Sequence, residues 1–89
     1  MKEALYFYLT RCPHCIKANA VLEEVKKDPK YAGVKLTLVE ESENEELAGK
    51  FDYNYVPTFF VDGKKFFEAQ PGKPFTADDC KALFNSILS

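Results

Sequence analysis

The chain has 89 residues, of which 46% are hydrophobic and 15% aromatic, enough for one packed core but not for two. Its formal net charge of −2 excludes the strongly basic surface of a typical nucleic-acid-binding protein, and nothing in the composition favours a membrane surface. The N-terminus runs straight into a strand-like pattern with no apolar leader. We therefore expect a single cytoplasmic domain over residues 1–89, a monomer that binds neither nucleic acid nor membrane.

The first half of the chain predicts a strand, a helix and a second strand. Residues 3–10 form a nearly continuous apolar run, as in a strand covered on both faces. A helical pattern follows over residues 13–27, with Ile16 among its core-facing positions, and an Asp-Pro dipeptide ends it. Residues 34–39 alternate apolar and polar side chains, with Leu38 on the apolar face. The helical crossover implies that the two strands are parallel.

An acidic run occupies residues 40–46. It can be read as an interaction patch, but its pattern favours a helix start. Ser42 with Glu45 three residues later fits a capping box, and glutamates in a first turn complement the helix dipole. We predict a short helix over residues 44–52.

The last part of the chain predicts a β-hairpin and a final helix. The Asp-Gly dipeptide at 62–63 separates two apolar runs, 56–61 and 64–68, and is a strong signal for a tight turn between antiparallel strands. Thr76 is a suitable N-cap for a helix over residues 77–88.

The sequence Cys12-Pro13-His14-Cys15 lies where the first strand meets the first helix. With Cys12 as N-cap and Pro13 as the first helical residue, the free N–H groups and the helix dipole favour a thiolate at Cys12. Positive charge on Arg11 and on protonated His14 acts in the same direction. Cys15 lies three residues on, at a spacing that suits a disulfide. We predict that Cys12 attacks a disulfide and that Cys15 resolves the mixed disulfide.

Other interpretations of the cysteines stay open. The pair could bind a metal or be structural, although a structural zinc site needs four ligands and the chain has no second Cys-x-x-Cys, so we expect no metal site. The third thiol, Cys80, lies on a helical stripe with Leu83, Phe84 and Ile87 and is predicted to be a core residue.

The predicted order β-α-β-α-β-β-α, with Cys-x-x-Cys after the first strand and Val56-Pro57 before the third, resembles the thioredoxin superfamily. Residues 47–64, LAGKFDYNYVPTFFVDGK, look like its helix-to-hairpin stretch. The resemblance implies an α/β fold with a four-stranded mixed sheet flanked by helices on both faces. It also implies that Pro57 is cis and lies against the cysteine pair, and that the Val56 backbone pairs with an extended substrate.

Within the superfamily the likeness is mixed. Thioredoxins carry Trp before the first cysteine and a buried carboxylate in the first strand, where this chain has Arg11 and Tyr6. Glutaredoxins share the size and the Pro after the first cysteine, but their Gly-Gly before the last helix is Phe-Glu at 67–68 here. The Pro-His dipeptide looks like that of periplasmic oxidases and predicts a reduction potential above the value of about −270 mV of thioredoxin.

The resemblance implies a thiol–disulfide oxidoreductase that reduces protein disulfides or glutathione mixed disulfides. Its expected partners are disulfide-containing proteins and, as electron donor, a reductase or glutathione; no cofactor is expected to be bound, and glutathione is a candidate co-substrate. We expect the catalytic residues to be Cys12, Cys15, His14 and Pro13. The substrate-binding residues are expected to be Arg11, Val56, Pro57, Thr76, Asp78 and Asp79. The alternatives are an iron–sulfur or metal carrier of glutaredoxin type and a non-catalytic binding module.

Overall fold

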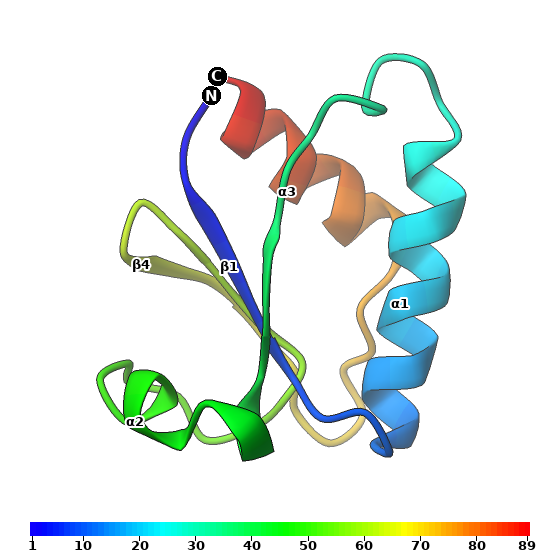
Figure 1. Cartoon of the computed structure of the whole chain (residues 1–89). Helices are drawn as coiled ribbons and strands as arrows, with labels where there is room; N and C mark the ends of the chain where they lie inside the picture. The colour runs from blue at the N-terminus through cyan, green and yellow to red at the C-terminus, as the bar shows by residue number, and fades with distance from the viewer.

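The computed structural model describes residues 1–89 and contains a four-stranded mixed sheet with helices on both faces (Figure 1). The strands lie in the order β2-β1-β3-β4, and the expected α/β fold is confirmed. Helices α1 and α3 cover one face, while the short helices η1 and α2 lie on the other. In chain order the elements are β1 (Ala4–Tyr8), α1 (Pro13–Lys26), β2 (Thr37–Glu40), the 3-10 helix η1 (Glu41–Glu43), α2 (Glu45–Ala48), β3 (Thr58–Val61), β4 (Lys64–Glu68) and α3 (Ala77–Leu88).

The strand pairing follows the predicted connections. The crossover through α1 makes β1 and β2 parallel, while β3 is antiparallel to both β1 and β4. Asp62 and Gly63 form the hairpin turn with φ angles of 51° and 80°, the left-handed region in which glycine is strongly favoured. The register between β3 and β4 shifts after Phe59, which faces Phe67. Phe66 is the extra residue at this irregularity and is 39% exposed.

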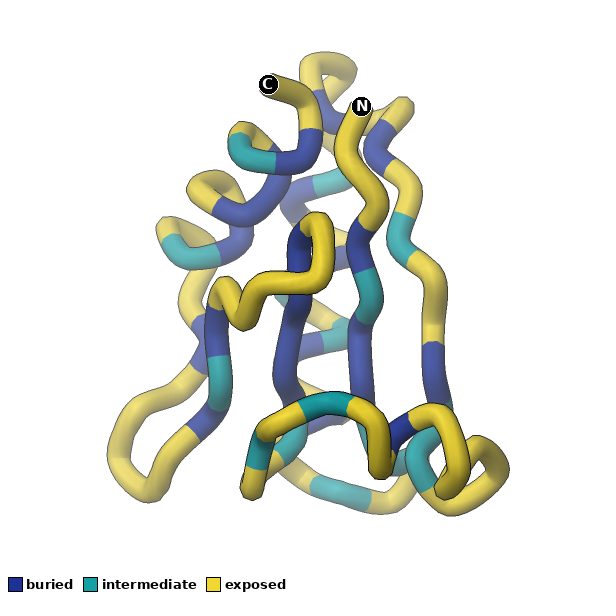
Figure 2. The backbone as a smooth tube through the Cα atoms, turned by 90° about the vertical axis from the view of Figure 1, so that its left-hand side faces the viewer, coloured by how far each residue is buried: buried dark blue, intermediate teal, exposed yellow.

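The larger core lies between the sheet and the helices α1 and α3. The central strands β1 and β3 are buried along most of their length, as Figure 2 shows. From α3 the core receives the predicted stripe of completely buried side chains, Cys80, Leu83, Phe84 and Ile87. A smaller cluster on the opposite face contains Phe7, Val39, Ala48 and Phe60. The sheet is therefore covered on both faces at the end from which β1 leads to Cys12.

Ile16 and Leu38, which the sequence analysis placed on core-facing positions, are exposed. Helix α1 packs on the sheet through one face that contains Cys15, Ala18 and Leu22. Ile16 lies about 100° around the helix from Cys15, and its side chain is therefore 56% exposed. Leu38 is 61% exposed because β2 is an edge strand, whose outer side has no neighbour. The neighbouring Val39 is buried instead, in the smaller cluster.

The helix predicted over residues 44–52 is shorter, and its predicted capping box is wrong. Helix α2 covers only Glu45–Ala48, and its N-cap Asn44 makes no side-chain capping bond. Ser42 donates instead to the side chain of Glu40, within the 3-10 helix η1. Gly49 follows directly after the last helical residue. Glycine disfavours the continuation of a helix, and a helix this short has little stability of its own, so α2 ends there.

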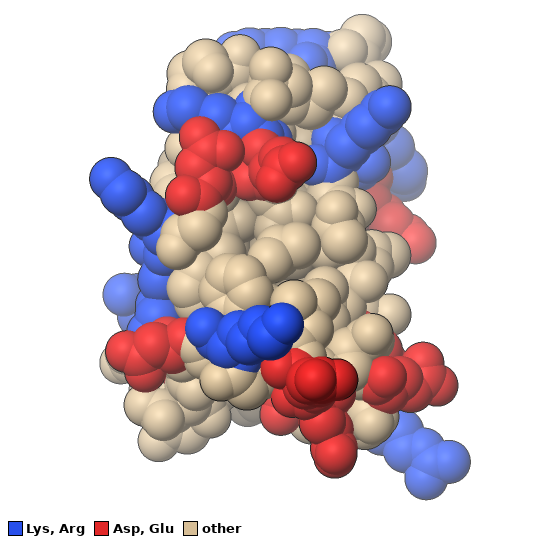
Figure 3. Space-filling model, turned by 60° about the vertical axis from the view of Figure 1, so that its left-hand side comes forward, with Lys and Arg blue, Asp and Glu red and all other residues tan.

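Acidic side chains gather at the lower end of the molecule in Figure 3, at the level of η1 and α2, with a largely uncharged area above them. The two chain ends lie side by side, and the Lys2 N–H donates to the Ile87 carbonyl at 2.7 Å. None of the helices combines the length and the apolar character that crossing a bilayer requires.

Candidate functional site

The loop after β1 places Cys12 at the start of α1. Strand β1 ends at Tyr8, and the Cys12 N–H donates to the Leu9 carbonyl at 3.2 Å, which closes a turn. Cys12 then has extended N-cap geometry, and Pro13 is the first helical residue. Both positions agree with the sequence analysis. The Cys12 Sγ accepts no capping hydrogen bond from the first turn of α1.

The two thiols of the pair differ in exposure. Cys12 is partly exposed, whereas Cys15 is completely buried. Burial raises the pKa of Cys15 to about 12, and the hydrogen bond and charge of Cys12 act in the same direction, while the Leu9 N–H, 3.4 Å from Cys15 Sγ, opposes them. Cys15 is therefore a neutral thiol near neutral pH, and Cys12 is the sulfur that a substrate can reach.

Tyr6 of β1 lies next to Cys15, at the first-strand position where the sequence analysis found no carboxylate. Its hydroxyl donates to Asn19 Oδ1 at 2.7 Å and lies 3.5 Å from the Cys15 carbonyl oxygen. The pKa of Tyr6 is raised, mainly by burial and then by the nearby Cys15. Tyr6 is thus a neutral hydroxyl at physiological pH, and the space under Cys15 holds no buried anion.

A cavity of about 510 Å³ opens beside Cys12, and its lining residues are Leu9, Thr10, Arg11, Cys12, Glu40 and Ser42. Glu40 connects the two sides of this cavity. Its carboxylate accepts from the Thr10 N–H at 3.0 Å and hydroxyl at 2.7 Å, and from the Ser42 N–H at 2.7 Å and hydroxyl at 2.6 Å. The loop before Cys12 is therefore tied to the end of β2. The sequence analysis read Glu40 only as part of an acidic run.

We expect Glu40 to be one of the last carboxyl groups to titrate in acid. Hydrogen bonds from Ser42 and Thr10 lower its pKa from 4.5 to about 2. A lowered folded-state pKa means that this stabilising contribution is complete above about pH 4.5 and is lost as the pH falls to about 2. Carbon-13 NMR titration of the glutamate carboxyls measures the midpoint directly.

The matched test is urea unfolding between pH 4.5 and 2. Glu40→Gln should flatten the loss of stability across this range because the amide does not titrate. Glu46→Gln, at an exposed position on α2 with no side-chain hydrogen bond, should leave the profile unchanged. Identical profiles for Glu40→Gln and the unsubstituted protein would contradict the assignment.

Pro57 lies on the other side of the site. The Val56–Pro57 peptide bond is cis, and Pro57 is fully buried. Thr58 pairs with Phe7, so Pro57 lies at the end of the sheet from which β1 continues to Cys12. A second cavity of about 200 Å³ joins Pro57 to α1; it is lined by His14, Lys17, Val21, Pro57, Ala69, Pro74 and Phe75. Pro57 and His14 of the cysteine motif thus share one cavity.

The start of α3 is placed differently from the rest of the predicted site. Thr76 and Asp79 form a complete capping box, in which Asp79 accepts from the Thr76 N–H at 3.0 Å and Thr76 Oγ1 accepts from the Asp79 N–H at 3.2 Å. Neither they nor Asp78 lines the cavity beside Cys12 or the cavity beside Pro57. The structure therefore places Arg11 in the cavity beside Cys12 and Pro57 in a cavity with His14 of the cysteine motif. The polar groups of Thr76 and Asp79 are instead used to cap α3.

Neither Cys80 nor the acidic side chains form a second candidate site. Cys80 is completely buried on α3, and burial raises its pKa to about 12. No group of three or more His, Cys, Asp and Glu side chains is arranged to hold a metal ion.

Comparison with known proteins gives a family match and several similar folds. The sequence model of the family described as Thioredoxin matches residues 2–84. A solved structure described as a malarial protein is 24% identical, with a TM-score of 0.71 over 100% of this chain and 99% of that chain. Thioredoxin from Malassezia sympodialis is 20% identical, with a TM-score of 0.71 over 99% of this chain and 76% of that one. None of the curated proteins compared with the chain matches it.

Thioredoxin O1 from Arabidopsis thaliana, in its oxidised state, is 21% identical, with a TM-score of 0.70 over 100% of this chain and 79% of that chain. At these identities the solved structures show the fold, while the family model covers most of the sequence, including Cys12 and Cys15. The strand order, the Cys-x-x-Cys pair at the start of α1 and the match over residues 2–84 agree with one another, and the chain belongs to the thioredoxin family.

Proposed function

We propose that this thiol–disulfide oxidoreductase acts as a dithiol reductase of protein disulfides. Membership of the thioredoxin family supports thiol–disulfide exchange in general. The observation that supports separate roles for Cys12 and Cys15 is the difference in exposure between their sulfur atoms. Cys12 is partly exposed and lines the 510 Å³ cavity, whereas Cys15 is completely buried directly behind it.

In the first step the Cys12 thiolate attacks one sulfur of the substrate disulfide. A Cys12–substrate mixed disulfide forms, and the other substrate sulfur leaves as a thiolate that takes up a proton. In the second step the Cys15 thiolate attacks Cys12 Sγ, the Cys12–Cys15 disulfide forms, and the second substrate thiol leaves. Two electrons have then passed from the dithiol to the substrate, and a donor thiol must return two electrons to the pair.

Cys15 has to lose its proton between these steps. Two of the influences that raise its pKa come from Cys12, namely a hydrogen bond and Coulomb repulsion. Both depend on a free Cys12, and both disappear once Cys12 is bound to substrate, whereas the Leu9 N–H remains 3.4 Å from Cys15 Sγ and favours the anion. Formation of the mixed disulfide therefore removes two of the influences that keep Cys15 protonated, while burial, the largest of them, remains. The departing substrate thiolate is a suitable acceptor for the Cys15 proton.

Val56 offers a binding edge for the polypeptide around the substrate disulfide. Its backbone N–H and C=O have no hydrogen-bond partner within the chain, and it precedes Pro57 at the site. Unpaired backbone groups at such a position can bind an extended segment as a strand does. We propose that the protein acts in the cytoplasm, because a reducing compartment keeps the cysteine pair in the dithiol form.

The electron donor can be identified by coupled assays. We expect the reduced chain to accelerate insulin reduction above the rate with dithiothreitol alone. The same reaction is then driven by NADPH with a thioredoxin reductase, or by glutathione with glutathione reductase. The electron donor is the one whose coupled assay shows turnover. A separate assay with a glutathione mixed disulfide as substrate tests whether glutathione is a co-substrate. No acceleration in any arm would overturn the proposed function.

A further inference from the structure

We infer that Glu68 is a positioning residue for disulfide exchange, because its carboxylate holds the loop that carries Val56 and Pro57, the latter in one cavity with His14 of the cysteine motif. The inference rests on the proposed function, in which the Val56 backbone binds the substrate polypeptide. Glu68 is the last residue of β4 and faces Thr58, the first residue of β3, across the hairpin. Its side chain therefore stands next to the loop that enters β3.

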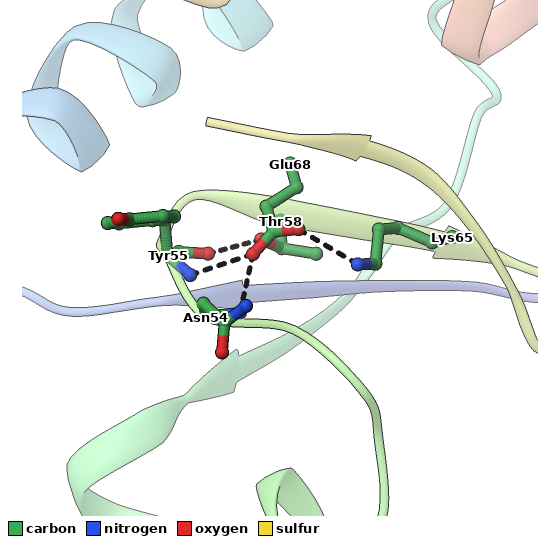
Figure 4. Close-up of polar contacts among 5 residues, drawn as sticks. All are labelled: Asn54, Tyr55, Thr58, Lys65 and Glu68. Atoms are coloured by element: carbon green, nitrogen blue, oxygen red, sulfur yellow. Dashed lines mark hydrogen bonds and ion pairs between the residues drawn. The ribbon is translucent and has the colours of Figure 1, made fainter. Parts of the chain in front are cut away.

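The carboxylate of Glu68 binds this loop through two backbone groups (Figure 4). Its Oε2 accepts from the Asn54 N–H at 2.5 Å and from the Tyr55 N–H at 2.9 Å. Its Oε1 accepts from Lys65 Nζ at 2.8 Å. The Glu68 side chain is only 11% exposed. Lys65, Asn54 and Tyr55 hold the pKa of Glu68 below its usual range, and Glu68 binds the loop as an anion.

The loop has few other fixed points near Val56. It contains no helix or strand between α2 and β3. Thr58 Oγ1 donates to the Tyr55 carbonyl, and the Ala69 N–H donates to the Pro57 carbonyl at 3.0 Å. These bonds fix the loop on either side of Val56, while its own backbone stays unpaired. The position of that unpaired edge therefore depends on the Tyr55 side being held in place, and Glu68 supplies the two bonds that hold the amides there.

Glu68 has no part in the environment of the two sulfurs. It lines neither the cavity beside Cys12 nor the cavity that contains Pro57 and His14. It is also absent from the groups that act on the pKa of Cys15. The two roles can thus be separated by substrate. A polypeptide disulfide needs the unpaired Val56 backbone for binding. A small disulfide such as dithiobis(nitrobenzoate), called dithionitrobenzoate below, needs only access to Cys12.

The test compares Glu68→Met, which keeps the length of the side chain without an acceptor, with the unsubstituted chain. We expect KM for insulin to rise about tenfold, the consequence of losing hydrogen bonds that fix the binding edge. The rate with dithionitrobenzoate and the reduction potential of the pair should not change. Glu68→Gln, whose amide oxygen can still accept from both N–H groups, should recover most of the loss. Lys65→Met removes the ion pair but keeps the loop bonds, and should behave like the unsubstituted chain.

An unchanged KM for insulin in Glu68→Met would overturn the inference, as would a parallel loss with both substrates. If Glu68→Met does not fold, Glu68→Asp decides in its place with the same two outcomes, because its carboxylate is one methylene shorter and cannot reach both amides. The proposed function is judged separately: it fails if the unsubstituted chain reduces neither disulfide, whatever the variants do.

Discussion

Replacing Cys12 by serine is expected to abolish the reduction of insulin, with a loss of more than about 10³-fold in kcat/KM. A serine hydroxyl stays protonated near neutral pH and cannot form the mixed disulfide. Cys15 cannot take over the attack because it is completely buried and its pKa is raised to about 12. The assay is insulin reduction with dithiothreitol as donor, at equal concentrations of folded protein.

Two matched variants make this result specific. Cys15→Ser should still form a mixed disulfide at Cys12, and mass spectrometry should find it accumulating because nothing within the chain resolves it. Cys80→Ala should keep its activity, since Cys80 is buried on α3 and lines neither cavity at the site. Substantial insulin reduction by Cys12→Ser, or no trapped species in Cys15→Ser, would refute the assigned order of attack.

Phe59→Ala is expected to lower the free energy of unfolding by about 3–5 kcal/mol, the usual range for a buried phenylalanine. Phe59 is completely buried on β3. Its ring stacks on Tyr6 with centroids 4.5 Å apart and on Phe75 with centroids 4.7 Å apart. The substitution thus opens a cavity between the sheet and the loop before α3. Urea unfolding monitored by circular dichroism measures the change.

Phe66→Ala in the same hairpin is the control for this prediction. Phe66 is 39% exposed at the irregular pairing of β3 with β4, and it takes part in none of the aromatic contacts. We expect a change of less than about 1 kcal/mol, because little apolar surface returns to water. Equal losses in the two variants would mean that the aromatic core does not determine the stability of the hairpin.

The candidate site was predictable where its geometry depends on neighbours in the sequence. Pro13 favours the first position of a helix and cysteine can precede it as N-cap, so the four-residue motif alone places Cys12 at the start of α1. The Asp62-Gly63 turn is likewise local, since it requires only two residues that tolerate positive φ angles. Thr76 begins α3 as predicted for the same kind of reason.

Glu40 and Glu68 were not predictable as parts of the site. Glu40 binds Thr10 across 30 positions of sequence, and Glu68 binds Tyr55 across 13. Neither separation leaves a periodic or capping signal. The capping box predicted for Ser42 failed for a related reason. Ser42 donates to the carboxylate of Glu40 instead of pairing with Glu45, and the spacing of these residues did not favour one partner over the other.

Element order, the strand-to-helix position of the cysteine pair and the hairpin follow from the amino-acid sequence, because turns, caps and periodic apolar faces act over a few residues. The exposure of Leu38 and Ile16 depends instead on the edge position of β2 and on how α1 lies on the sheet. In the same way, the contacts of Glu68 depend on the register of β4 against β3, which shifts after Phe59. Such features arise only when distant segments pack together, and packing contacts carry no fixed spacing along the chain.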